Sequence, residues 1–342
     1  MSFPQLQNQL RIIFWYTMLG AAIGAVYSEF DLALYGLPHF GWYGAPRGAM
    51  TGAVIGGILV TLEVYVLWTP VGSSLRRSAF AVHVAVKTMI YLIVILLALW
   101  LGALALPAPG EHGIESEDVL FSFAAAFFFV FLLNVNRLLG QNVLLNFVTG
   151  RYHQPRLEDR ILLFIDMEGS TGLAERLGPL AFHRLLNHFV TDLTTPIVAA
   201  RGEIYRYVGD ELIATWKLAD GLAEARCVSA CFAAMDELAR RAPDYRREFG
   251  AAINFRAGLH CGPVVTGEMG SVKQEIVLLG DTVNTAARIQ DFCREAGDRV
   301  LASANLIDRL EILPGITKRS LGDLRLRGKG TDLALYALTE AP

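Results

Sequence analysis

Long apolar stretches dominate the first 140 residues of the chain. Four of these stretches meet or approach the ~20 residues that a helix needs to cross the hydrocarbon core of a bilayer. They lie at about 12–28, 48–68, 80–106 and 119–139. Only six of the 30 basic and seven of the 33 acidic residues fall within 1–140. The pattern predicts an N-terminal all-α transmembrane bundle of four helices over 1–140, a linker at 141–157 and a second domain over 158–342.

Basic residues in the connections between these stretches predict how the chain is oriented. The connection at 69–79 carries Arg76 and Arg77, whereas the connection at 107–118 has no basic residue and four acidic ones. Lys and Arg are enriched in the cytoplasmic loops of membrane proteins. We therefore expect a multi-pass protein of the cell membrane, inner or plasma, with both termini in the cytoplasm. The linker is then either a passive tether or the path of a membrane signal.

Small and ionisable residues interrupt the apolar spans. Glycines recur at every fourth position, at Gly20 and Gly24 and again at Gly48, Gly52 and Gly56. This spacing lets helix backbones approach closely, either within one bundle or between two copies of the chain. Glu63 and Lys87 lie near the cytoplasmic ends of their spans. They either pair with each other or extend to the membrane interface.

Beyond the linker, short apolar runs alternate with segments of helical periodicity. The order of these segments, βα-ββ-αβ with extra strands, predicts an α+β domain of the ferredoxin-like kind. The predicted elements are a buried strand at 161–166, a helix at 172–200 with breaks at Pro179 and Pro196, a hairpin at 203–216, a helix at 220–241, strands at 254–262 and 264–269, a helix at 282–296, a strand at 299–303, a helix at 303–311 and closing strands to Leu338.

Composition excludes several classes of protein. The net charge is −3, which lacks the basic excess of a nucleic-acid-binding protein, so we expect no nucleic-acid partner. The chain is 53% hydrophobic, which excludes a disordered protein. Four cysteines occur without a CxxC pattern or a zinc-ligand spacing. They are expected to be reduced core thiols.

Two carboxylates stand at the ends of predicted strands. Asp166 ends the first strand, and Asp210 lies at the tip of the hairpin. If the two strands are neighbours, the carboxylates converge and can hold two divalent ions, Mg²⁺ or Mn²⁺. The backbone through Gly169, Ser170 and Thr171, at a predicted helix start, offers N–H groups to phosphates. Taken alone, each Asp also fits an ordinary turn or cap residue.

Two further segments carry polar residues at a suggestive spacing. Asn284 and Arg288 are four residues apart in a predicted helix and share one face. An amide can position a ribose, and a guanidinium can meet charge that develops on a phosphate. Arg327 and Lys329 lie in a basic, glycine-rich turn that suits terminal phosphates. The alternatives are a solvent-facing polar pair and an ordinary hairpin.

These four motifs, in this order, resemble the class III adenylyl/guanylyl cyclase catalytic domain. The resemblance covers about 158–340 and rests on Phe-x-Asp-Met-x-Gly-Ser-Thr, Val-Gly-Asp-Glu, Gly-Asp-Thr-Val-Asn-x3-Arg and Arg-Gly-Lys-Gly. It implies an adenylate cyclase that converts ATP to 3′,5′-cyclic AMP and pyrophosphate by two-metal catalysis. It also implies a head-to-tail homodimer with two shared sites.

The resemblance further assigns roles to residues. One subunit would supply the ligands of the two metals, which are Asp166, Asp210 and the Ile165 carbonyl. The other subunit would supply the residues that bind and activate the substrate, which are Asn284, Arg288 and Arg327.

The residues at the base-reading positions depart from the family pattern. Adenylyl cyclases place Lys and either Asp or Thr at these positions, guanylyl cyclases place Glu and Cys, and this chain has Arg206 and Val277. Arg206 can donate a hydrogen bond to adenine N1, but Val277 cannot accept one from the N6 amine. We favour ATP, because guanine requires an acceptor for its N1–H group and its N2 amine.

Other classes of protein compete with this interpretation. A guanylate or dual-specificity cyclase differs only in base choice. A diguanylate cyclase shares Gly209-Asp210-Glu211, although Val208 and Leu212 do not fit that signature. A catalytically inactive cyclase-like signalling or dimerisation protein would not need both metal-binding Asp residues. A four-span transporter would leave the second domain unexplained.

Overall fold

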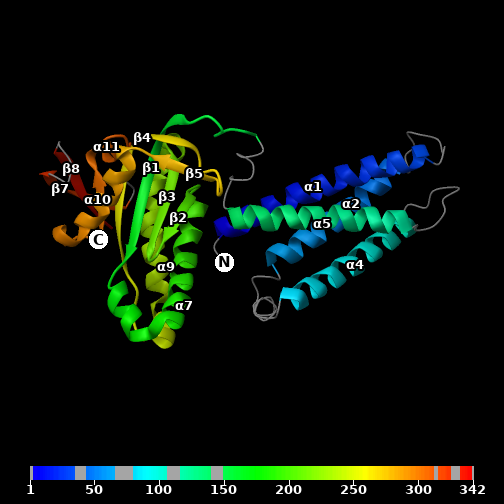
Figure 1. Ribbon diagram of the computed structural model, residues 1–342, viewed down its shortest axis with the longest axis horizontal. Coiled ribbons are helices and arrows are strands. Elements are labelled where there is room, and N and C mark those ends of the chain that lie inside the picture. Colours follow the sequence, from blue (N-terminus) through cyan, green and yellow to red (C-terminus); the bar gives the residue numbers. More distant parts are fainter. Residues whose placement is uncertain are drawn as a thin grey trace. The chain divides into compact units, whose positions relative to one another are not determined.

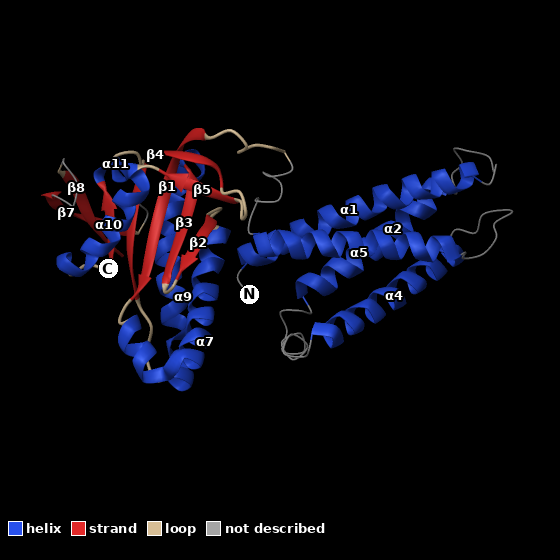
Figure 2. Ribbon diagram, viewed as in Figure 1, coloured by secondary structure: helices blue, strands red, loops and turns tan. Residues whose placement is uncertain are grey.

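The computed structural model describes residues 3–34, 44–65, 80–105, 116–139, 149–311, 315–324 and 332–340. The chain divides into two compact units, Met1–Leu138 and Leu139–Pro342. The first is helical, and the second combines a sheet with helices (Figure 2). Arg327 and Lys329, together with the linker up to residue 148, lie outside the described residues.

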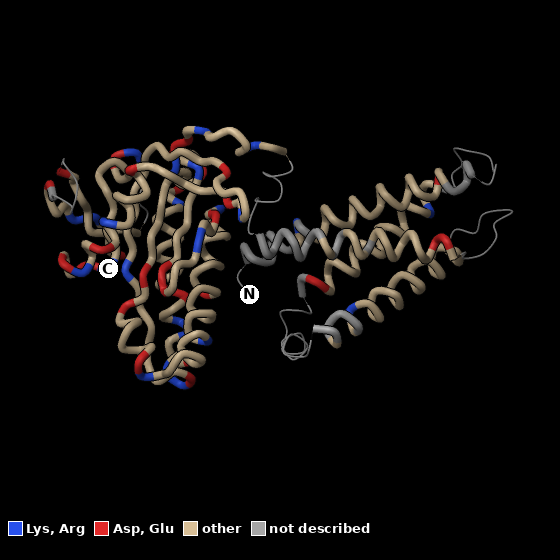
Figure 3. Tube along the Cα trace, in the orientation of Figure 1, with Lys and Arg blue, Asp and Glu red and all other residues tan. Residues whose placement is uncertain are grey.

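The N-terminal unit has a long helix at each of the four predicted spans. These helices are α1 (Phe3–Leu34), α2 (Gly44–Tyr65), α4 (Phe80–Ala105) and α5 (Ser116–Leu139). Charged residues are sparse along them and frequent in the other unit (Figure 3). Within the described residues, two stretches are long and apolar enough to cross a membrane, Ala45–Glu63 and Val86–Ala105.

Glycines bring α1 and α2 into backbone contact. A Cβ atom added to Gly20 would collide with the carbonyl of Gly52, and one added to Gly24 would collide with that of Gly48. The opposed glycines leave no space for side chains, so the two helices can approach at backbone distance. The glycine repeat is therefore used within a single chain.

An ion pair joins α2 to α4. Lys87 Nζ donates to Glu63 Oε1 at 2.8 Å, and Tyr91 Oη donates to Glu63 Oε2 at 3.2 Å. The Glu63 residue is only 3% exposed. Of the two expectations for these ionisable residues, the structure shows the pairing.

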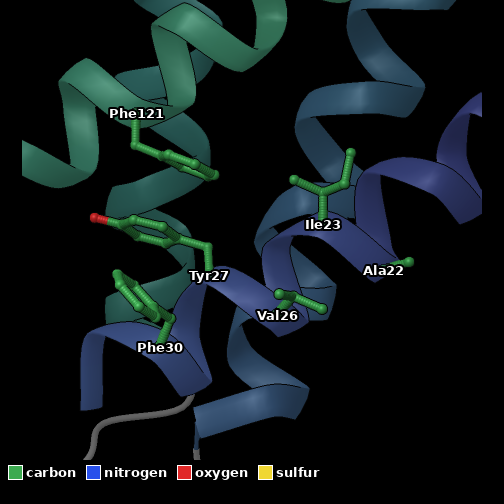
Figure 4. A pocket seen from close by; sticks show the side chains of 6 residues that line it. All are labelled: Ala22, Ile23, Val26, Tyr27, Phe30 and Phe121. Carbon is green, nitrogen blue, oxygen red and sulfur yellow. The ribbon is translucent and has the colours of Figure 1, made fainter. Parts of the chain in front are cut away.

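Aromatic packing joins α1 to α5. The rings of Tyr27 and Phe121 stack with centroids 3.9 Å apart, and Tyr27 Oη donates to Asp118 Oδ1 at 3.1 Å. This stack forms one wall of an open apolar groove (Figure 4). The groove is lined by Ala22, Ile23, Val26, Tyr27, Phe30 and Phe121.

The C-terminal unit is built on a sheet in the order β2-β3-β1-β4-β6-β8-β7, with β5 paired to β4 (Figure 1). The first four strands with α7 and α9 form the expected ferredoxin-like arrangement. The strands are β1 (Arg156–Met167), β2 (Glu203–Val208), β3 (Glu211–Lys217), β4 (Phe255–Met269), β5 (Glu275–Leu279), β6 (Val300–Ser303), β7 (Ile316–Leu324) and β8 (Leu333–Glu340). The longer helices are α7 (Ser170–Ala199), α9 (Arg226–Phe249) and α10 (Asp281–Ala296).

The two faces of the sheet are covered differently. Ile161, Leu163 and Ile165 on β1 point to the core beneath α7 and α9, since side chains alternate along a strand. Leu162 and Phe164 point to the opposite face, where they share a smaller cluster with residues of α10. Because α10 covers only part of that face, the ends of β1, β2 and β3 stay accessible there.

Three strands differ from those predicted. β1 begins at Arg156, inside the predicted linker. The sequence did not indicate this start, because the first residues of β1 are mostly polar and show no apolar run. The two strands predicted at 254–262 and 264–269 form the single strand β4, which passes through the exposed Pro263. β5 was not predicted from the sequence.

Two helices also differ from those predicted. The helix predicted at 220–241 is displaced, because a short helix α8 (Leu218–Leu222) and a turn with positive φ at Glu224 and Ala225 precede α9. The helix predicted at 303–311 shortens to α11 (Ala304–Ile307).

Candidate active site

A row of charged residues crosses three adjacent strands at one end of the sheet. Asp166 on β1 lies opposite Glu211 on β3 and opposite Arg256 on β4. Residues directly opposite in a ladder point to the same face, so all three side chains lie on the face that α10 partly covers. Gly209, with φ of 64°, forms the β2–β3 turn and places Asp210 beside this row.

The carboxylates in this region repel one another. Burial raises the pKa of Asp166 to about 6, and the charge of Asp210 and its hydrogen bond with Asp166 add to this effect, whereas Arg256 opposes it. Burial likewise raises the pKa of Glu211 to about 7, with contributions from Asp166, Asp291 and Asp210. A bound cation would relieve this repulsion.

The donor set suits a hard divalent cation. Asp166 and Asp210 supply oxygen ligands, which Mg²⁺ and similar ions prefer. Within the described part of the chain, no group of three or more His, Cys, Asp and Glu side chains forms a metal site by itself. Two carboxylates match the usual protein contribution to a Mg²⁺ site, which is one or two carboxylates plus substrate oxygens. The Ile165 side chain is buried in the core, so only its carbonyl could contribute.

The segment after Asp166 turns into α7 through Gly169. This glycine has φ of 70°, in the left-handed region, and its carbonyl accepts the Leu173 N–H at 3.1 Å. The helix then begins at Ser170 and Thr171 with no side-chain cap, so its first N–H groups face outward. This is the predicted phosphate-binding segment, two to four residues beyond the end of β1.

The exposed face of α10 carries the predicted amide and guanidinium. Asn284 is exposed and Arg288 is partly exposed, while Thr285 and Ile289 on the other side of the helix are buried. Asp291 follows on the same face, three residues after Arg288.

The predicted base-reading positions lie on β2 and β5. A bulge between Ile204 and Arg206 interrupts the β2–β3 ladder. Tyr205 Oη accepts the Leu278 N–H of β5 at 3.1 Å, and the Arg206 guanidinium lies 5.4 Å from the Tyr205 ring centroid. Arg206 is ion-paired with Glu275. Val277 follows Glu275 by two residues and is partly buried.

Four residues near these positions were not singled out from the sequence. Glu211 is adjacent to Asp210, and Asp291 continues the face that bears Arg288. The spacing along the sequence could therefore have indicated both residues. The sequence gives no such indication for Arg256 and Glu275, because their positions depend on strand register and on the unpredicted β5. They are visible only in the folded chain.

The fold and the charged row agree with a catalytic domain of the nucleotide cyclase type. The chain matches the family described as adenylate and guanylate cyclase catalytic domain over residues 153–340. It belongs to this family, as the class III cyclase motifs predict.

Named relatives agree with this assignment. Adenylate cyclase 2 of Rhizobium meliloti (strain 1021) is 38% identical over 210 residues, which cover 61% of this chain and 58% of that protein. Adenylate cyclase of Anabaena cylindrica is 26% identical over 180 residues, which cover 51% and 36%. This chain thus spans less than two thirds of either relative.

A solved structure supports the fold. A bacterial light-regulated adenylyl cyclase is similar with a TM-score of 0.56 at 20% identity, over 67% of this chain and 66% of that one.

Proposed function

We propose that the chain is a membrane-anchored adenylate cyclase that converts ATP to 3′,5′-cyclic AMP and pyrophosphate. The observation that carries this proposal is the convergence of Asp166 and Asp210 on the accessible face of a cyclase-family domain. The choice of ATP is supported by a relative, 38% identical, that bears the name adenylate cyclase 2.

Asp166 and Asp210, with the Ile165 carbonyl, are the proposed ligands of two divalent ions, Mg²⁺ or Mn²⁺. Such ions, when bound, supply Lewis-acid stabilisation of charge on phosphate oxygens. The mutual repulsion of the two carboxylates favours this role, because it raises the affinity of the site for cations.

The remaining residues orient the substrate. The ribose 3′-oxygen forms a bond to the α-phosphorus, the bond from that phosphorus to the leaving pyrophosphate breaks, and the hydroxyl proton is released. Asn284 would hold the ribose and Arg288 would meet the charge on the α-phosphate. The N–H groups at Gly169–Thr171 would receive phosphate oxygens, and Arg327 and Lys329 the terminal ones.

We propose that two copies share each site in a head-to-tail homodimer. Asn284 and Arg288 lie on the outer face of α10, where a second copy can meet them. The metal ligands of one subunit would then act together with this pair from the other.

The N-terminal unit is the proposed membrane anchor. Apolar side chains project from α4 into the surroundings, which is unfavourable in water and favourable in lipid. Their exposed fractions reach 66%, and they include Ile93, Leu97, Trp100 and Leu104. With the loop charges, this supports a multi-pass protein of the cell membrane whose catalytic unit and termini are cytoplasmic.

Product analysis tests the proposed activity. The purified full-length protein is incubated with ATP or GTP and with Mg²⁺ or Mn²⁺, and the products are separated and identified. We expect cyclic AMP and pyrophosphate in equal amounts. Cyclic GMP as the main product would contradict the base choice, and no cyclic nucleotide under any condition would contradict the proposed function.

A further inference from the structure

The β-bulge in β2 aims two side chains at the catalytic face. Because Tyr205 and Arg206 together oppose the single residue Ile213, both lie on the side of the sheet where Ile213 packs. Glu211 is two residues from Ile213 along β3 and pairs with Asp166, so it lies on the same face. Two residues of strand span about 7 Å. Arg206 is therefore offset by two residues along the strand from the charged row of Asp166, Glu211 and Arg256.

β5 brings a carboxylate to this guanidinium. The hydrogen bond from Leu278 N–H to Tyr205 Oη joins β5 to the edge strand β2. Three residues earlier, Glu275 Oε2 pairs with Arg206 and Glu275 Oε1 pairs with Lys273. The two cations lower the pKa of Glu275, Lys273 most strongly, so this side chain stays ionised at neutral pH. A donor and an acceptor thus stand side by side.

A donor beside an acceptor matches the edge of adenine. Adenine N1 accepts a hydrogen bond, and its neighbouring N6 amine donates one. The guanidinium of Arg206 has five N–H donors, and its pairing with Glu275 leaves others available. We propose that Glu275, together with Arg206, selects adenine by accepting from the N6 amine, which Val277 cannot do. This inference rests on the proposed nucleotide cyclase activity.

The position of Arg206 beside Glu275 favours adenine over guanine. The N1 atom of adenine accepts a hydrogen bond, whereas guanine carries an N1–H donor at the same place. The guanidinium of Arg206 has only donors, so it can pair with N1 of adenine but not with N1–H of guanine. The carboxylate of Glu275 is bonded to Arg206 through Oε2 and to Lys273 through Oε1, and its oxygens keep lone pairs that can accept the N6 amine.

Nucleotide analogues test this role directly. The full-length protein and its Glu275→Ala variant are assayed with ATP and with purine riboside triphosphate, which lacks the 6-amino group. We expect Glu275→Ala to lower kcat/KM for ATP by about 10- to 100-fold, the range for a hydrogen bond to a charged group, and to leave the analogue nearly unchanged. The preference of the protein for ATP over the analogue should disappear.

Two further variants control for indirect effects. Glu275→Gln keeps an acceptor oxygen and should retain part of the preference for ATP. Glu224 also forms an ion pair with an arginine, Arg226 at 2.9 Å, but lies in the turn before α9. Glu224→Ala should leave the preference as it is in the wild type. Circular dichroism confirms that each variant is folded.

Specific outcomes would overturn the inference. Equal losses with ATP and the analogue in Glu275→Ala would show that Glu275 only supports the structure. If the wild type prefers GTP and Glu275→Ala abolishes this preference, then Glu275 recognises guanine. If the wild type makes no cyclic nucleotide, the proposed activity fails. Competition of ATP and the analogue for a fluorescent nucleotide then still decides whether Glu275 recognises the 6-amino group.

Discussion

Asp166 is placed where its charge is costly to the folded chain without a cation. The side chain is half-buried and stands beside Asp210, with Glu211 opposite it in the ladder and Asp291 on α10. The pKa of Asp166 is raised in the folded chain, so its ionisation at neutral pH lowers the free energy of unfolding. This loss of stability develops as the pH rises above the pKa of Asp166 in the unfolded state. A residue that destabilises the fold in this way is typical of a functional site.

Replacing Asp166 by Asn should separate stability from function. Without cations, Asp166→Asn should unfold at the same temperature as the wild type or a higher one, because it removes one repelling charge. Mg²⁺ or Mn²⁺ should raise the unfolding temperature of the wild type only. Differential scanning calorimetry measures both effects. An equal cation response in the variant would contradict the metal assignment.

Arg288 should act on the rate of reaction. Arg288→Ala removes a donor that meets charge in the transition state, so kcat should fall by about 10²-fold or more. Its side chain is partly exposed and outside the main core, so the unfolding temperature should change little. Steady-state kinetics with ATP test this. An unchanged kcat would remove Arg288 from the proposed machinery.

The sequence predicts some of these residues and not others. Asp166 and Asp210 can be located because each ends a strand whose apolar pattern is strong. Glu275 cannot, because it meets Arg206 only after β5 folds back onto the edge strand. The distance between these two residues in space depends on register and a bulge, and neither follows from local spacing.

Among the elements, α10 depends on a close approach to the sheet. A Cβ atom added to Gly258 of β4 would lie 2.4 Å from the backbone nitrogen of Gln290. That atom belongs to the helix backbone and cannot move without shifting α10, which carries Asn284 and Arg288. The close approach of α10, and with it the position of the proposed catalytic pair, thus requires a residue without a side chain at position 258.

Gly258→Ala should therefore destabilise the C-terminal unit by about 1–3 kcal/mol, the usual cost of overpacking. Gly172→Ala is the matched control, because an added Cβ there meets nothing within 4 Å and lies in helix α7. This control should be neutral or stabilising. Chemical denaturation measures both variants. Equal stabilities would show that α10 can shift freely.

The ion pair between α2 and α4 should matter to the N-terminal unit. Lys87→Met leaves the buried Glu63 carboxylate without its cation, which should cost on the order of 3 kcal/mol. Adding Glu63→Gln to Lys87→Met should recover most of the loss. Thermal unfolding of the detergent-solubilised protein tests this. An unchanged stability in Lys87→Met would show that the pair contributes nothing.

Strong periodicity explains which elements could be predicted. The four apolar helices, the hairpin of β2 and β3, and α10 all have clear patterns and lie near their expected residues. The start of β1 and the whole of β5 were missed because their pairing with β4 stabilises them, whereas their own residues show little pattern. Tertiary contacts outweigh local preference in both.

For the whole molecule, the central question is whether two chains build one site. The proposed metal ligands lie on β1 and the β2–β3 turn, and the proposed amide and guanidinium lie on α10. Asp291 of α10 also influences Asp166 within the same chain. The helix could therefore serve its own site or that of a second copy, and the homodimer proposal requires the second arrangement.

Subunit mixing tests this claim most directly. Asp166→Ala and Arg288→Ala should each retain little or no activity alone, and equal amounts of the two are co-expressed and assayed with ATP. Half of the dimers would be mixed, each with one intact site of two, so about a quarter of the wild-type activity should return. No recovery, with mixed dimers demonstrated by differential tags, would contradict a site shared between subunits.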